Sequence, residues 1–323
     1  TNYDKLIEKS LTEAGKISDT KYRVKQLSFT KRGRDAVVYK MHGDIDNPDE
    51  AVITKDDYEN YHVKMQPFIN ALSGDLVSKT FLFLGFSFTD PNLDYILSRV
   101  RISYSNDQRQ HYCIQKLVAP TTDASQADTE YKIRKQELFI QDLLRFGIKT
   151  ILVSDYSEIT DILHQLEWAY RRKTIFLSGS AHEYGRWKSD EAQYFIYSLS
   201  KEIAALGFRI VSGFGLGVGS SVITGVLENV YMSGKRLDSE QLILRPFPQY
   251  EVGKRPISEI WNDYRTDMIS YAGIAIFVFG NKIKDGNIVV ADGLIKEFEI
   301  AKNNGLLLIP VGATEYATRE IYN

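Results

Sequence analysis

The chain has 323 residues, of which 43% are hydrophobic and 25% are charged, so it is long enough for two hydrophobic cores and has the composition of a globular protein. Its net charge of −2 gives no electrostatic support for binding to nucleic acid or to an anionic membrane. The longest apolar runs have the length of a strand and are too short to span a membrane. We therefore expect a cytoplasmic protein with neither kind of partner.

Cysteine content limits the possible metal chemistry. Cys113 is the only cysteine, which excludes an intrachain disulfide and a Cys-x-x-Cys zinc ribbon. A small buried apolar residue on a strand is the simplest role for it. The sequence predicts no metal site.

Helical and strand patterns alternate along the first half of the chain. The expected helices are 3–15, 54–72, 131–146, 156–170 and one that begins at Pro91 with Asp90 as its N-cap. The expected strands are 35–41, 111–115 and 149–153, and 81–88 is expected to be a buried strand that ends in a turn. Residues 119–130 are polar without periodicity and predict an exposed loop. Such alternation is typical of a doubly wound parallel sheet.

The pattern repeats in the second half, after the basic trio 171–173. The expected strands are 174–178, 208–212, 241–246, 274–280 and 306–312, and the expected helices include 257–270, 295–303 and one that starts near Ser221. The sequence thus predicts an α/β protein with two doubly wound, Rossmann-like parallel-sheet domains. We place these domains at residues 1–172 and 173–323.

Three short motifs in the first domain indicate nicotinamide chemistry: Thr1-Asn2-Tyr3-Asp4, His42-Gly43-Asp44 and Gly85-Phe86-Ser87-Phe88. An Asn amide is both a donor and an acceptor, and a neutral imidazole can accept a hydroxyl proton near neutral pH. A lone His-Gly-Asp is more often a turn with a solvated histidine, so the order and spacing of the three motifs carry the interpretation.

In this order the motifs resemble the catalytic region of the sirtuin family, in its bacterial branch, over about the first 170 residues. The resemblance implies that His42 acts as a general base and that Asn2 holds the ribose or the attacking water. It implies the following NAD-binding residues: Thr1, Asn2, Asp4, His42, Gly85 and Ser87.

Two departures from the sirtuin pattern refine this interpretation. Sirtuins carry a glycine-rich phosphate loop upstream of the Thr-Asn-x-Asp turn, and the chain begins on that turn. We therefore expect the first domain to lack its N-terminal part, which would leave half of an NAD site. Deacetylating sirtuins contain a four-cysteine zinc module, and its absence favours a reaction that needs only NAD and water.

The second domain contains a glycine loop, Gly213–Gly219, between an expected strand and an expected helix. Its N–H groups would lie at a positive helix terminus, where phosphate binds well. The spacing matches neither the dinucleotide Gly-x-Gly-x-x-Gly motif nor the P-loop. The alternative is a tight turn that allows close packing of helix and sheet.

This loop, together with Gly179-Ser180-Ala181 and with Asp292-Gly293 followed by Glu297, resembles the SLOG superfamily of nucleotide-sensing domains and phosphoribohydrolases. The enzymes carry Pro-Gly-Gly-x-Gly-Thr-x-x-Glu, of which only Gly293 and Glu297 remain, so binding is favoured over hydrolysis. Arg265 and Lys282 are candidates to neutralise phosphates, and Glu297 to accept from ribose hydroxyls. The implied signal-binding residues are Gly179, Ser180, Leu216, Gly217, Arg265, Lys282, Gly293 and Glu297.

A sirtuin-like domain followed by a SLOG domain resembles the NAD-consuming effector of the Thoeris antiphage defence system. The resemblance implies an NAD+ hydrolase that releases nicotinamide and is switched on by a cyclic ADP-ribose isomer, which a TIR-domain partner makes. It also implies a homo-oligomer. Two alternatives remain open: a nucleotide-binding module with an inactive sirtuin remnant, and a SLOG-type nucleotide phosphoribohydrolase.

Overall fold

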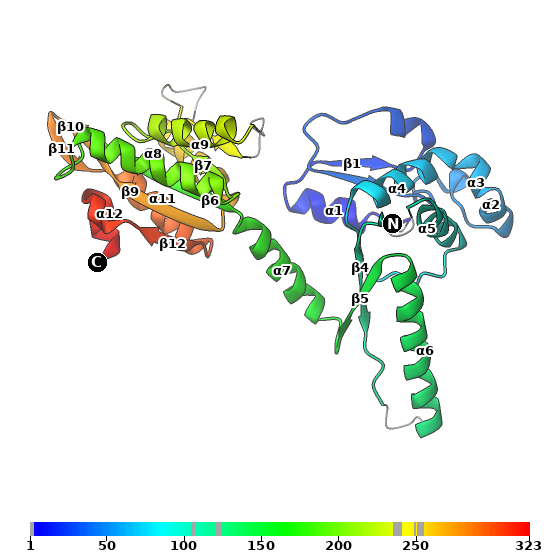
Figure 1. Ribbon diagram of the computed structural model, residues 1–323. Coiled ribbons are helices and arrows are strands. Elements are labelled where there is room, and N and C mark those ends of the chain that lie inside the picture. Colours follow the sequence, from blue (N-terminus) through cyan, green and yellow to red (C-terminus); the bar gives the residue numbers. More distant parts are fainter. Residues whose placement is uncertain (1–2, 105–106, 121–124, 235–240, 249, 251–254) are drawn as a thin grey trace. The chain divides into compact units, whose positions relative to one another are not determined.

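The computed structural model describes residues 3–104, 107–120, 125–234, 241–248, 250 and 255–323. It divides into two compact units, Thr1–Ile159 and Thr160–Asn323 (Figure 1). Each unit is built around its own parallel sheet. The α/β fold with two Rossmann-like domains is therefore confirmed.

Unit 1 contains a three-stranded sheet in the order β3-β4-β5 and a separate pair, β1-β2. All of these strands pair in parallel. Their bounds are β1 Ser18–Lys21, β2 Ala36–Tyr39, β3 Leu82–Phe83, β4 His111–Lys116 and β5 Ile148–Val153. The helices are α1 Leu6–Glu13, α2 Lys55–Glu59, α3 Tyr61–Lys64, α4 Gln66–Ser78, α5 Pro91–Tyr104 and α6 Gln126–Arg145, with short 3₁₀ turns at Val24–Ser28 (η1) and Pro48–Glu50 (η2).

The helix expected over 54–72 is wrong, because the structure breaks it into α2, α3 and α4. Pro67 lies in the first turn of α4, where its missing N–H costs nothing, whereas inside a continuous helix it would remove a hydrogen bond. Thr54 caps α2 by accepting from the backbone N–H of Asp57. The expected cap of α5 is present, since the Asp90 carboxylate accepts from the N–H of Asn92 at 2.9 Å.

The segment 81–88, expected to be a buried strand that ends in a turn, forms a strand of two residues and then a turn. Only Leu82–Phe83 pairs with β4, and Leu84 is 42% exposed rather than buried. Gly85 and Phe88 both adopt positive φ angles, of 61° and 59°, which bend the chain out of the sheet. The aromatic run therefore becomes a short strand followed by a turn.

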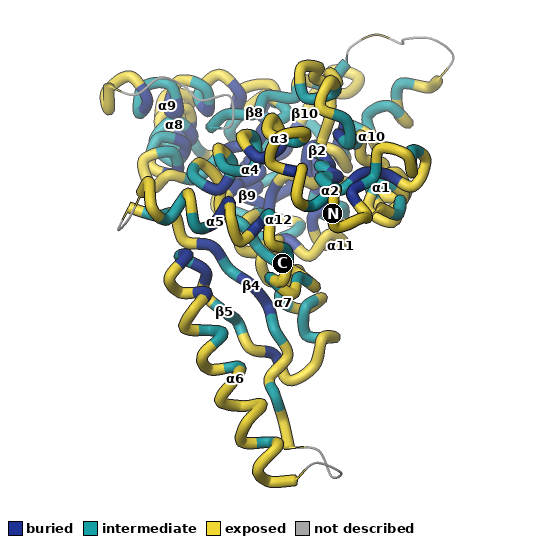
Figure 2. The backbone as a smooth tube through the Cα atoms, turned by 90° about the vertical axis from the view of Figure 1, so that its right-hand side faces the viewer, coloured by how far each residue is buried: buried dark blue, intermediate teal, exposed yellow. Residues whose placement is uncertain are grey.

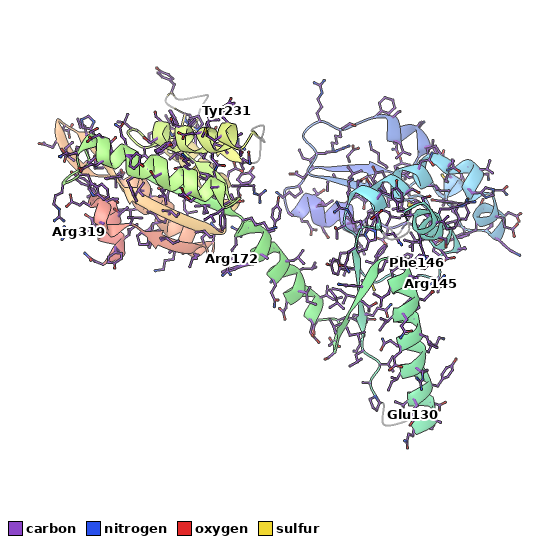
Figure 3. The ribbon with its side chains drawn as sticks, in the orientation of Figure 1. Glu130, Arg145, Phe146, Arg172, Tyr231 and Arg319 are labelled. Carbon is purple, nitrogen blue, oxygen red and sulfur yellow. The ribbon has the colours of Figure 1, made fainter. Side chains whose placement is uncertain are left out.

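The long helix α6 connects β4 to β5 and begins earlier than expected, at Gln126. It is exposed along most of its length, whereas β4, the middle strand of the sheet, is largely buried (Figure 2). At its C-terminal end Arg145 pairs with Asp142 and Phe146 enters the core (Figure 3). Gly147, with φ of 71°, ends the helix as predicted.

Unit 2 contains a five-stranded parallel sheet in the order β12-β9-β6-β7-β8. The strand bounds are β6 Thr174–Ser180, β7 Arg209–Ser212, β8 Leu242–Leu244, β9 Ile274–Phe279 and β12 Leu307–Pro310. Numbered from its first strand, this is the 3-2-1-4-5 order of a Rossmann sheet, with its switch point between β6 and β9. Ligands bind at the carboxyl ends of the strands beside such a switch point.

Helices cover both faces of this sheet, each over its own apolar cluster. They are α8 Ser189–Ala205, α9 Gly219–Met232, α10 Ile257–Ser270, α11 Asp292–Asn303 and α12 Tyr316–Tyr322, the last preceded by a 3₁₀ turn at Gly312–Thr314. Helix α7, Glu158–Arg171, precedes β6 and has no buried residue. An antiparallel hairpin, β10 Asn281–Lys284 and β11 Asn287–Val290, follows β9 and was not expected from the sequence.

Candidate functional site

His42 lies on a tight turn just beyond the end of β2. The N–H of Gly43 closes this turn on the Lys40 carbonyl at 3.1 Å, and the His42 carbonyl accepts from the N–H of Val52 at 2.8 Å. Gly43 has a φ of 109°, and a Cβ there would lie 2.8 Å from the Cα of Ala51. The glycine of the motif is therefore required both by its backbone angle and by its neighbour.

The imidazole of His42 faces the carboxylate of Asp90, with Nε2 and Oδ2 3.2 Å apart. Burial raises the pKa of Asp90, but the hydrogen bond and charge of His42 and two backbone N–H groups outweigh it and lower that pKa overall. In a neutral imidazole this bond places the proton on Nε2 and leaves Nδ1 as the acceptor. The rings of Tyr58 and Tyr61 lie 5.5 and 5.6 Å from the imidazole and hold it in place.

The Gly-Phe-Ser-Phe turn is connected to His42 by Asp90, which lies three residues after Ser87 in the chain and contacts the imidazole. Gly85 and Ser87 are exposed, and the Ser87 hydroxyl contacts that of Thr89 at 2.7 Å. A cavity of about 470 Å³ between η1 and α3 shares two wall residues, Val52 and Tyr61, with the surroundings of His42, but His42 does not line it.

The N-terminal motif is described only in part, because Thr1 and Asn2 lie outside the described residues. Asp4 is described. Its carboxylate accepts from the N–H of Leu6 at 2.9 Å, and its carbonyl accepts from the ammonium of Lys40 at 2.6 Å. Asp4 is thus joined to the His42 loop by a buried side chain.

Unit 2 contains a cavity of about 420 Å³ at the carboxyl ends of β6 and β7, bounded by α10, the hairpin and the start of α11. Six of the eight residues expected to bind a signal line it: Gly179, Ser180, Arg265, Lys282, Gly293 and Glu297. Ser178, Phe247 and Trp261 also line it and were not anticipated.

Leu216 and Gly217 do not line this cavity. The Leu216 carbonyl accepts from the N–H of Ala181, and the Gly217 carbonyl accepts from the Tyr184 hydroxyl. Both residues therefore tie the glycine loop to the segment after β6. Close packing explains part of this loop, since a Cβ on Gly215 would lie 1.9 Å from the Gly179 carbonyl oxygen.

A buried ion pair forms the floor of the cavity. Arg265 and Glu297 are each 8% exposed, and Nε of the arginine lies 3.3 Å from Oε1 of the glutamate. The other carboxylate oxygen accepts from the Ser178 hydroxyl at 2.6 Å. Burial nevertheless raises the pKa of Glu297, because these two partners offset only part of the loss of water.

The cavity rim carries a second, more exposed pair. The ammonium of Lys282 on β10 binds the carboxylate of Asp292, the first residue of α11, and this contact lowers the pKa of Asp292. A Cβ on Gly293 would lie 2.9 Å from a terminal nitrogen of Arg265. The first turn of α11 therefore meets the guanidinium, and two cations and a helix N-terminus converge on the cavity.

Sequence reasoning missed Asp90 and Lys40 as members of the first site. Asp90 was recognised only as a helix cap, and its contact with His42 joins residues 48 apart. The available signal for Lys40 was a lysine that follows an apolar strand and lies two residues before His42. Among the described ranges, no group of three or more histidine, cysteine or acidic residues could hold a metal ion.

Comparison with known proteins assigns both units. Residues 1–138 match the SIR2-like domain, and residues 158–323 match the Sir2- and TIR-associating SLOG family. The chain is 58% identical over 323 residues to the NAD(+) hydrolase ThsA of Bacillus cereus (strain MSX-D12), covering 100% of the chain and 67% of the relative. It belongs to the ThsA family.

Two other ThsA proteins also match over the whole of this chain. Those of Acinetobacter baumannii (strain 532279) and Enterococcus faecium, both named NAD(+) hydrolase, are 48% and 44% identical over 329 and 331 residues. The match covers 100% of this chain and 68% of each relative. In this ThsA-family chain, His42 and Asp90 fall within the SIR2-like match and the cavity of unit 2 falls within the SLOG match. No helix in the described ranges is long and apolar enough to cross a membrane.

Proposed function

We propose that this chain is an NAD+ hydrolase that cleaves the nicotinamide–ribose bond in its SIR2-like domain and acts as the effector of Thoeris antiphage defence. The observation that carries the proposal is the His42–Asp90 pair, placed on a SIR2-like fold at a distance of 3.2 Å. The names of the ThsA relatives support the reaction.

The residues have the chemistry that this reaction needs. Loss of neutral nicotinamide leaves an oxocarbenium-like ribose, and the water that adds to it gives up a proton. His42 accepts that proton from water or from a ribose hydroxyl, and Asp90 stabilises the resulting imidazolium and fixes the ring orientation. Asn2 and Thr1, with Asp4, Gly85 and Ser87, are proposed to position the ribose and the rest of the dinucleotide.

We further propose that the SLOG cavity is the regulatory site and that a cyclic ADP-ribose isomer, made by a TIR-domain partner, binds there in a homo-oligomeric protein. Arg265, Lys282 and the N-terminus of α11 supply positive potential for a pyrophosphate. Glu297, Gly179, Ser180 and Gly293 complete the walls, and a volume of about 420 Å³ suits a ligand of this size. Leu216 and Gly217 would act by shaping the loop behind the cavity.

The test is to incubate the full-length protein with NAD, with and without cyclic ADP-ribose isomers, and to measure free nicotinamide. We expect release that depends on the isomer and is abolished by His42→Ala. Isomer binding without release of nicotinamide would favour a nucleotide-binding module instead. Release of free base from a nucleoside monophosphate would favour a phosphoribohydrolase in unit 2.

A further inference from the structure

Lys40, which the proposed reaction does not use, is one of the most deeply buried side chains of unit 1. It is 1% exposed, yet it carries a charge, and it directly follows β2 at the start of the His42 turn. Its ammonium has three N–H donors and lies within hydrogen-bond distance of four acceptor atoms. They are the carbonyls of Tyr3 at 3.1 Å and Asp4 at 2.6 Å, and the carboxylates of Glu8 at 3.0 Å and Asp44 at 2.6 Å.

A buried charge is costly unless it is fully partnered, so an apolar side chain would be the simpler way to fill this space. The partners of Lys40 also come from two separate segments of the chain. Asp44 lies two residues after His42 and Lys40 two residues before it, so the Lys40–Asp44 ion pair links the two ends of the loop that carries His42. The other three acceptors belong to the N-terminal turn and α1.

The same two segments are joined by a second set of bonds. The Tyr3 carbonyl also accepts from the N–H of Ile45 at 3.0 Å. The Tyr3 hydroxyl donates to the Val52 carbonyl at 2.6 Å, and the N–H of Val52 donates to the His42 carbonyl at 2.8 Å. The N-terminal turn and the segment that carries His42 are thus joined by a backbone bond and by the Tyr3 hydroxyl, in addition to the contacts of Lys40.

We infer that Lys40, together with Asp44, is a positioning residue that sets the distance between the His42 imidazole and the turn at Tyr3–Asp4. This inference rests on the proposed NAD hydrolysis at His42. In the proposed reaction the ribose is held between these two segments, and a shift of about 1 Å in such a geometry can cost about 10²-fold in rate. Lys40 contacts no substrate in this role and acts through the two segments that it joins.

The test compares Lys40→Met with Lys21→Met in the full-length protein. Lys21 is a matched control, because it is a buried lysine on the neighbouring strand β1 that binds Asp19 at 2.8 Å and the Phe29 carbonyl at 2.5 Å and does not contact the N-terminal turn. Below the unfolding temperature of each variant, we expect kcat for nicotinamide release to fall about 10²-fold in Lys40→Met and by less than threefold in Lys21→Met.

A double variant, Lys40→Met with Asp44→Leu, separates positioning from stability. It removes both charges of the pair, so it recovers thermal stability relative to the single variant. Positioning predicts that it stays slow, because the Asp4 carbonyl still lacks the Lys40 ammonium and the Tyr3 carbonyl keeps only the N–H of Ile45. Recovery of kcat together with stability would overturn the inference, as would an unchanged kcat in Lys40→Met.

His42→Ala is measured in parallel. If it releases nicotinamide at the parent rate, the proposed site fails and the inference with it. If His42→Ala is inactive and Lys40→Met retains the parent kcat, only the inference fails.

Discussion

Each unit contains a buried ion pair beside its candidate site, and the two pairs differ in how well their charges are compensated. In unit 1, burial disfavours the charged forms of Lys40 and Asp44, but the hydrogen bonds and charges of their partners outweigh this effect. The pKa of Lys40 is therefore raised and that of Asp44 is lowered. In unit 2, burial has the largest effect on the pKa of Glu297 and raises it, although the contacts with Arg265 and Ser178 lower it. The first pair is fully partnered by the protein, whereas the second borders an open cavity.

This difference separates a structural connection from a binding site. A pair whose acceptors all come from the protein stabilises one arrangement of the backbone. A guanidinium that gives only part of its donors to a carboxylate and faces a cavity has capacity left for a ligand. We therefore expect the two pairs to respond differently to substitution, ligand and pH.

The largest expected effect is on stability. Lys40→Met leaves Asp44 without its closest partner and should lower the free energy of unfolding of unit 1 by about 3–5 kcal/mol. Arg265→Met should cost unit 2 less, about 1–3 kcal/mol, because the glutamate can take up a proton. The same pairing makes charge reversal at Arg265 a poor test, since it would bury two carboxylates together.

The two units can be followed separately, because Trp168, Trp187 and Trp261 are the only tryptophans and all lie in unit 2. Tryptophan fluorescence in urea should shift for Arg265→Met, while Lys40→Met should shift only the circular dichroism transition of unit 1. An equal or larger loss for Arg265→Met would contradict the contrast between the two pairs.

The next effect is on ligand affinity. Lys282→Ala removes a cation from the cavity rim and should weaken binding of the cyclic ADP-ribose isomer by about tenfold or more, the loss of one charged hydrogen bond. Lys284→Ala on the same hairpin is the matched control, because Lys284 is exposed and does not line the cavity. Calorimetry measures both. Equal affinities in the two variants would show that the isomer binds outside this cavity.

A smaller effect concerns pH. Because the pKa of Glu297 is raised in the folded state, its contribution to stability is greatest at low pH and is lost as pH rises from its ordinary value of 4.5 through the raised value. Asp44 shifts the opposite way, so its contribution is lost only as pH falls below 3.8. Between pH 5 and 8, Glu297→Gln should therefore reduce the change of the stability of unit 2 with pH, and the exposed control Glu299→Gln should not. A parent curve that rises with pH relative to Glu297→Gln would reverse the assignment.

The smallest expected effect is that of chelation. The sequence offers no cysteine cluster, so prolonged treatment with a chelator should change neither thermal unfolding nor nicotinamide release. Loss of either property on chelation, with recovery on adding zinc, would reveal a site built from histidine and carboxylates.

Much of the fold could be predicted from the sequence, because buried parallel strands are apolar runs bounded by glycine and by helical periodicity. The strand expected at 274–280 and the helix at 257–270 match β9 and α10 closely. The hairpin after β9 was missed because Asn281–Lys284 is polar and short. The break at Pro67 was missed because the apolar pattern continues across it.

The candidate sites were predictable only where glycine motifs or single cations carried the signal. The sequence placed Arg265, Lys282 and Glu297 in one site, and they line one cavity. It could not show that Arg265 pairs with Glu297, or that His42 pairs with Asp90, because these contacts join residues 32 and 48 positions apart. Such pairings depend on how the helices pack, which local patterns do not specify.

The most direct test of the account is nicotinamide release by the full-length protein at saturating NAD and signal, compared among the parent, His42→Ala, Asp90→Asn and the exposed control Asp94→Asn. We predict that His42→Ala and Asp90→Asn lose about 10²- to 10⁴-fold in kcat and that Asp94→Asn keeps the parent rate. Parent-like rates for His42→Ala or Asp90→Asn would contradict the assignment of the His42–Asp90 pair as the centre of NAD cleavage.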